Sequence, residues 1–163
     1  MSAATRALWI VVSIAIAGSA VHAASGTWDR AANIKDAAKR LGALHRREGS
    51  PGVLKFLDAC YRTHMLASDF SKGLEACMAQ DFMHSQVLAT IYSKVPADQR
   101  ARLDAPSPEL IARGMQQRFA AAFAQYRIAT ADVDVFKVLV EKQGMPVFLK
   151  AVFPNSAKPQ GGK

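Results

Sequence analysis

The chain has 163 residues, of which 50% are hydrophobic, 8% aromatic and 21% charged. This composition is typical of one globular domain, and the length is too short for two ordinary domains. The formal net charge is +8, but the basic stretch 35–47 contains no aromatic residue that could stack on bases, which disfavours nucleic acid as a partner. The sequence also contains no phosphate-binding glycine loop and no familiar catalytic motif, so no cofactor is predicted.

Residues 1–23 have the three parts of a secretory signal peptide. A single basic residue, Arg6, precedes the uncharged apolar run Leu8–Ala17, and a small-residue pattern ends at Ala23. The run is shorter than the roughly 20 apolar residues that span a bilayer as a helix. We therefore predict cleavage after Ala23 and export to the periplasm or the medium. Removing 23 of the 163 residues leaves a mature chain of 140 with a net charge of +7, because Arg6 is lost.

Apolar residues at three- and four-residue steps predict an all-α fold, a compact disulfide-pinned bundle of five to six helices around a central antiparallel helical hairpin. Gly49 is the predicted end of the first helix. Ser71 and Ser107 are predicted caps, because a serine hydroxyl accepts a free backbone N–H at a helix start. The predicted helices cover Asp29–Glu48, Ser50–Ala67, Ser71–Lys94, Pro96–Leu103, Pro108–Arg127 and Met145–Phe153.

The segment 131–143 can be interpreted as a strand or as a helix. Its four valines favour a strand. Apolar residues at helical intervals favour a helix, and no second strand is predicted with which the segment could pair. We predict a helix that begins near Thr130 and is broken by Gly144.

The chain therefore divides into three parts. The signal peptide covers 1–23, and a single helical domain covers 24–153. Residues 154–163 have nothing to bury, so they are predicted to form a disordered basic tail.

Cys60 and Cys77 are the only cysteines, and an oxidising compartment favours their pairing. They are equidistant from the turn predicted to begin at Ser68, so in an antiparallel hairpin they face each other. We predict a disulfide whose closed loop stabilises the fold by roughly 3 kcal/mol. The spacing differs from the Cys-x-x-Cys of redox catalysts, so the predicted role is structural.

Zinc and copper are the metals that the residues near this turn could bind. Cys60 and His64 share one helix face, and Cys77 and His84 share another, as zinc ligands would. The two histidines lie in opposite directions from their cysteines, which separates them by roughly 16 Å at the rise of a helix. One tetrahedral ion cannot take both, so no metal site is predicted. Copper is a weaker alternative, because methionine at helical spacing more often fills a core. The copper candidates are His64, Met65, Met78, Met83 and His84.

Asp81 and His64 are the polar residues in unexpected places, because both fall on apolar helix faces, where an unpaired polar group is costly. They are the candidate catalytic residues. They are predicted to lie about 12 Å apart at helical rise, so each should be satisfied by another helix, and structural contacts are favoured over chemistry. No role is predicted for His45, which lies in a basic stretch. The candidate partners are Arg62, Tyr126 and Arg118.

Two classes of function compete. The first is a non-catalytic binding or interaction protein whose partner is an anionic membrane surface, a cell-envelope polymer or a protein. The alternative is a small cell-wall-acting hydrolase, for which Asp81 with Glu75 or Asp58 is the best carboxylate pair, since glycoside cleavage needs two about 5 to 9.5 Å apart. The lack of a catalytic motif favours the first hypothesis, and the oligomeric state stays open.

Overall fold

The computed structural model describes residues 28–154, and every regular element in this part of the chain is helical. The predicted all-α fold is confirmed. The predicted signal peptide, and the predicted tail beyond its first residue, lie outside the described residues. None of the described helices is both long and apolar enough to cross a membrane. The elements are α1 (Arg30–His64), α2 (Lys72–Ser93), α3 (Ala97–Arg102), α4 (Pro108–Gln125), α5 (Thr130–Leu139), the π-helical turn η1 (Val140–Gly144) and α6 (Met145–Val152).

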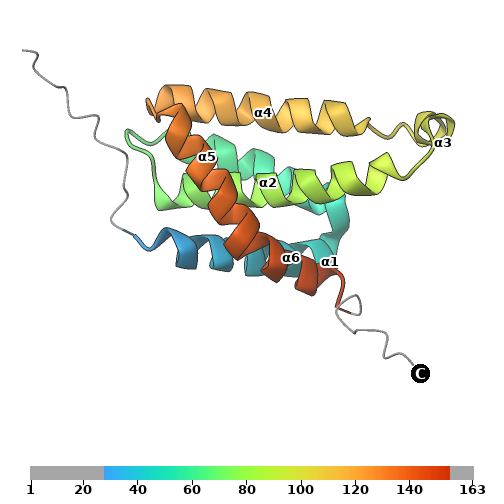
Figure 1. Ribbon diagram of the computed structural model, residues 1–163, viewed down its shortest axis with the longest axis horizontal. Helices are drawn as coiled ribbons and strands as arrows, with labels where there is room; N and C mark the ends of the chain where they lie inside the picture. The colour runs from blue at the N-terminus through green and yellow to red at the C-terminus, as the bar shows by residue number, and fades with distance from the viewer. Residues whose placement is uncertain (1–27, 155–163) are drawn as a thin grey trace, which may run out of the picture.

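Gly49 divides α1 into two halves. Its φ of 64° and ψ of −169° belong to a region that is essentially restricted to glycine. The chain turns back at this point, so that the second half of α1 runs beside α2 (Figure 1). The predicted helix end at Gly49 is therefore present as a kink between two helical stretches. The second stretch ends at His64, short of the predicted Ala67.

A Gly49→Ala substitution should lower the free energy of unfolding by about 1 to 2 kcal/mol, because the Cβ makes this backbone conformation strained. An added Cβ at Gly49 would meet only Pro51 Cδ, at 3.6 Å, so the cost is conformational rather than steric. Urea denaturation followed by circular dichroism measures it. The control is Gly114→Ala, in a regular helical turn, where the new methyl group meets only the tip of Arg118 at 3.3 Å. An equal loss in both variants would contradict the assigned role of Gly49.

The helix at the centre of the bundle is α2. Every residue from Leu74 to Ser85 is buried, as expected for a helix that is surrounded by others. The two halves of α1 pack on it, α4 runs along it, and the helix formed by α5, η1 and α6 crosses it diagonally (Figure 1). As predicted, Ser71 caps α2 by accepting the Leu74 N–H at 3.1 Å. Because α2 is enclosed, its polar residues must find partners on the surrounding helices.

Four phenylalanines fill the core between α2, α4 and α5. Phe119 on α4 contacts Phe82, Phe123 and Phe136, with ring centroids 5.8 to 6.3 Å apart. Ser107 caps α4 as predicted and accepts the Leu110 N–H at 3.2 Å. The cap and the aromatic cluster together hold α4 along α2. This packing brings Arg118 of α4 to Asp81 of α2, a contact described below.

The predicted break at Gly144 is wrong. The segment before it is helical, as predicted, but the helix continues through η1 into α6. A Cβ at Gly144 would lie 2.9 Å from both Ile34 Cγ2 and Met83 Sδ, so this glycine allows close helix packing and does not end the helix. Pro146 follows in the first turn of α6 and lacks the N–H of a regular i→i−4 bond. A π-helical turn ahead of it accommodates this local irregularity.

Candidate functional site

An apolar groove of about 610 Å³ lies between the C-terminal half of α2 and α6. Its lining follows helical spacing, since residues four apart share one face of a helix. Ile91 and Leu149, both large and apolar, are 42% and 37% exposed within it. The groove therefore presents apolar surface that the described residues leave open to solvent. Its lining residues are Val87 and Ile91, then Met145, Leu149 and Phe153, and the more polar stripe of Gln86, Thr90 and Lys94.

Lys94 supplies the positive charge of this groove. It follows Gln86 and Thr90 at four-residue steps, so all three lie along one edge of α2. The Thr90 hydroxyl donates to the Gln86 carbonyl at 2.8 Å, whereas the Lys94 side chain has no ion pair or side-chain hydrogen bond with any residue between 28 and 154. The ammonium group is therefore available to a bound anion.

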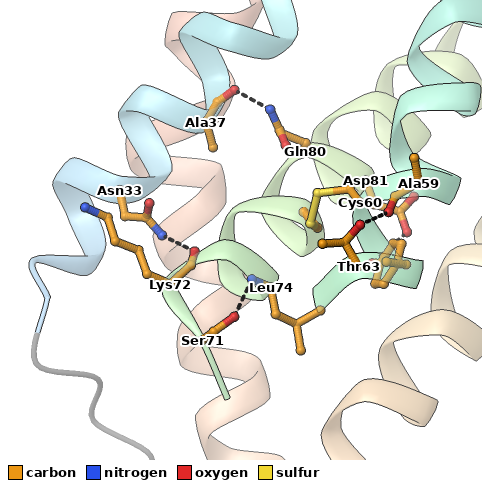
Figure 2. The surroundings of a disulfide bond; sticks show 12 residues. Asn33, Ala37, Ala59, Cys60, Thr63, Ser71, Lys72, Leu74, Gln80 and Asp81 are labelled. Atoms are coloured by element: carbon orange, nitrogen blue, oxygen red, sulfur yellow. Dashed lines mark hydrogen bonds between the residues drawn. A yellow bond between two sulfur atoms is a disulfide. The ribbon is translucent and has the colours of Figure 1, made fainter. Parts of the chain in front are cut away.

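A second, smaller hollow of about 350 Å³ lies beside the disulfide, between α1 and α2. An adjoining hollow of about 330 Å³ shares Arg40, Phe56 and Gln80 with it, so the two form one continuous depression. The Gln80 amide is fixed by donating to the Ala37 carbonyl at 3.1 Å (Figure 2). Arg40, which lines both hollows, makes no ion pair with the described residues, so it gives the depression a positive charge.

The predicted Cys60–Cys77 pair lies at disulfide distance, with Cα atoms 5.9 Å apart, and joins α1 to α2 (Figure 2). The half-buried imidazole of His64 lies over Gly73, where any side chain would collide with it. A ring nitrogen of His64 and the two sulfur atoms all lie within 4.8 Å of one another. His64 is therefore placed beside the disulfide and away from Asp81, to which it makes no hydrogen bond.

Asp81 is 1% exposed and is fully engaged. Arg118 donates from Nε and Nη2, each at 2.7 Å, Tyr61 donates its hydroxyl at 3.0 Å, and Ser85 donates at 3.1 Å. The predicted partner Arg118 is thus confirmed, and Tyr61 was missed. Burial and the Asp81 carboxylate raise the pKa of Tyr61 above its usual range, so its hydroxyl keeps the proton that it donates. The network joins α1, α2 and α4.

The other two candidate partners make no hydrogen bond to the side chain of Asp81 or His64. Arg62 pairs with Asp58 at 2.5 Å on the surface. The Tyr126 hydroxyl donates to the carbonyls of His64 and Ala67, at 3.2 and 3.1 Å, so it fixes the backbone of the turn after α1.

Glu75, the proposed second carboxylate of a hydrolase, is wholly buried. It accepts from Trp28 at 2.7 Å, from Arg30 at 2.5 Å and from Asn33 at 3.0 Å. The oxygens of Glu75 and Asp81 are thus taken by arginine and by further donors, and neither carboxylate presents a free oxygen to a substrate. The geometry of both is that of buried ion pairs that join helices.

His84 and His45 form a contact that the sequence did not predict. The His84 ring is 1% exposed and its centroid lies 6.2 Å from that of His45, which in turn meets Phe148 at 6.1 Å. Burial, followed by the neighbouring His45, lowers the pKa of His84 to about 4. Its Nε2 has no hydrogen-bond partner among the described residues. The available signal was the position of His45 one helical turn after Leu41, on the apolar face.

The candidate copper ligands do not share a site. His64 lies beside the disulfide and His84 beside His45. Met78 and Met83 are wholly buried and fill the core, and Met65 packs against its edge. Within residues 28–154, the one group of histidine, cysteine or acidic side chains that could hold a metal ion is Cys60, His64 and Cys77.

Comparisons of the chain with protein-family models, with curated proteins and with solved structures find no match.

Proposed function

We propose that this chain is an exported, non-catalytic binding protein whose groove between α2 and α6 takes a single-chain amphiphile with an anionic head group, such as a fatty acid. The observation that carries the proposal is the open apolar groove of about 610 Å³, a volume within the usual range of small-molecule sites. Apolar side chains of α2 and α6 line the groove together, which suits a hydrocarbon chain.

The positive charge at Lys94 supports the choice of an anionic head group. Lys94 lies at the end of the polar stripe and is the C-cap residue directly after α2, which ends at Ser93. An acyl chain along Val87 and Ile91 would bring its carboxylate to this end of the groove. The net charge of the mature chain, +7 after loss of Arg6, favours the approach of anionic ligands and of anionic membrane surfaces in the same way.

Two features support export. Residues 1–23 have the pattern of a signal peptide, and both cysteines are joined in a disulfide, which persists in oxidising compartments. Expression of the full chain in a bacterial host and mass spectrometry of the periplasmic fraction test this part. The expected N-terminal residue is Ala24, and recovery of the uncleaved chain from the cytoplasm would contradict it.

Binding is tested by isothermal titration of the purified chain with palmitate. We expect saturable binding, and Ile91→Asp should weaken it at least about tenfold, because a carboxylate buried against the acyl chain is costly. Lys94→Gln should weaken palmitate binding by about fivefold, the size of an exposed ion pair, and leave binding of the uncharged hexadecanol unchanged.

The matched control is Leu103→Asp. Leu103 is also a large exposed apolar residue, 73% exposed, but it lies on the far side of Lys94 in the connection after α3, outside the lining of the groove. The Leu103→Asp variant should bind palmitate as the unmodified chain does. Failure of palmitate to bind, or an equal loss in Leu103→Asp and Ile91→Asp, would count against this groove as the site.

A further inference from the structure

We propose that reduction of the Cys60–Cys77 disulfide converts it, together with His64, into a zinc site. The two sulfurs and a His64 ring nitrogen already lie within 4.8 Å of one another, across α1 and α2. In the oxidised chain the two sulfurs are bonded to each other, so they are not free to bind a metal ion. The site is independent of the apolar groove, which is lined by other residues.

The ligand types and their placement suit zinc. Two thiolates and one imidazole are a ligand set of zinc sites that keep a fourth position for water or substrate. Cys60 and His64 are four residues apart on one helix face, so their side chains project in the same direction. Tetrahedral zinc holds its sulfur ligands roughly 3.8 Å apart, at Zn–S distances of about 2.3 Å, so the two bonded sulfurs must move apart after reduction.

Gly73 fixes the third ligand in position. The His64 ring lies in the space that a side chain at residue 73 would fill, so the imidazole rests on the first turn of α2, four residues before Cys77. Packing against Gly73 therefore places the His64 ring next to the disulfide. The zinc site would need the two cysteine side chains to rotate so that their sulfurs move apart.

The fourth zinc position would face the depression beside the disulfide. Cys60 and His64 line this hollow together with Arg40 and Phe56. A water or a small anionic ligand on the metal would thus be reached from solvent, and Arg40 supplies positive charge beside it.

The zinc site forms in two steps, reduction of the disulfide and binding of the metal. A dithiol reductant transfers two electrons and two protons to the disulfide, so that the Cys60–Cys77 bond breaks, two thiols form, and the dithiol becomes a disulfide. Zinc then binds as both thiols release their protons to solvent, and the neutral imidazole of His64 donates a lone pair. Exchange with a disulfide oxidant, which is itself reduced to a dithiol, re-forms the Cys60–Cys77 bond and releases the zinc ion.

The test uses the full chain, reduced with a water-soluble phosphine, because a dithiol would itself bind zinc. Cobalt(II) is added first, since its thiolate absorption bands report sulfur ligands, and zinc affinity is then measured by competition with a chromophoric chelator. One zinc per reduced chain is expected, and none for the oxidised chain. His64→Gln should weaken zinc binding at least about tenfold.

His45→Gln is the matched control, because it removes a histidine from the same helix but not from the site. It should leave zinc affinity unchanged. Equal weakening by His45→Gln and His64→Gln would overturn the proposal, as would zinc binding by a Cys60→Ser/Cys77→Ser variant with the affinity of the reduced chain. Circular dichroism of the reduced chain before titration must still show the helices, and their loss would overturn it as well.

Discussion

Replacing Asp81 with alanine is expected to lower the free energy of unfolding by about 3 kcal/mol, the low end of the range for breaking a buried ion pair. The carboxylate accepts four hydrogen bonds, and its removal leaves Tyr61 and Ser85 without an acceptor. Arg118 loses its partner too, but its side chain is 43% exposed and can turn to water, which limits the cost. Thermal or urea unfolding of both proteins measures the difference.

The control for this effect is Asp98→Ala. Asp98 pairs with Arg102 at 3.0 Å on the surface, where an ion pair contributes at most about 0.5 kcal/mol. A double variant, Asp81→Leu with Arg118→Met, should recover only part of the loss, because it replaces both charges with apolar groups but still leaves Tyr61 and Ser85 without an acceptor. If Asp81→Ala instead stabilised the chain, Asp81 would behave as a strained functional residue, and the hydrolase hypothesis would gain support.

Local signals determined the parts of the fold that the sequence could predict. The caps at Ser71 and Ser107 depend on the residue itself and on a backbone N–H three positions later. The disulfide followed from two cysteines equidistant from one turn, which is also a local relation. The burial of Asp81 could be predicted in the same way, from the face of its own helix.

Contacts between distant segments account for what could not be predicted. Gly144 looks like a helix end in the sequence, because its close approach to Ile34 and Met83 involves residues far away in the chain. Tyr61 reaches Asp81 only because the kink at Gly49 directs the second half of α1 along α2. The apolar groove depends on the angle at which α6 crosses α2, and no stretch of sequence encodes that angle.

The polar residues of α2 show how the buried centre of the bundle is organised. Glu75 joins α2 to the start of α1, and Gln80 joins α2 to the middle of the first half of α1. Asp81 joins α2 to α4. Each is paired through a contact that fixes one helix against α2, so the polar groups specify how the bundle is assembled. His84 differs from these residues, because its Nε2 has no partner within the described part of the chain.

His84 should make the fold sensitive to acid. Its pKa is lowered from the usual 6.5 to about 4 in the folded chain, first by burial and then by His45, with Asp81 opposing and Arg118 adding to the shift. The unfolded chain therefore binds a proton at a higher pH than the folded chain does. The contribution of neutral His84 to the free energy of unfolding is complete above about pH 6.5. It is lost as the pH drops to about 4. The loss is about 3 kcal/mol, at about 1.36 kcal/mol for each pKa unit.

His84→Leu should remove this dependence, because leucine binds no proton and leaves no buried nitrogen unpaired. Relative to the unmodified chain, the variant should gain about 3 kcal/mol between pH 6.5 and 4, whatever its stability at pH 7. Titrating groups that do not interact with His84 are shared by the two proteins, so they cancel in the comparison. Met83→Leu, a wholly buried neighbour without a titrating group, should keep the slope of the unmodified chain. Parallel slopes for His84→Leu and the unmodified chain would show that acid acts elsewhere in the bundle.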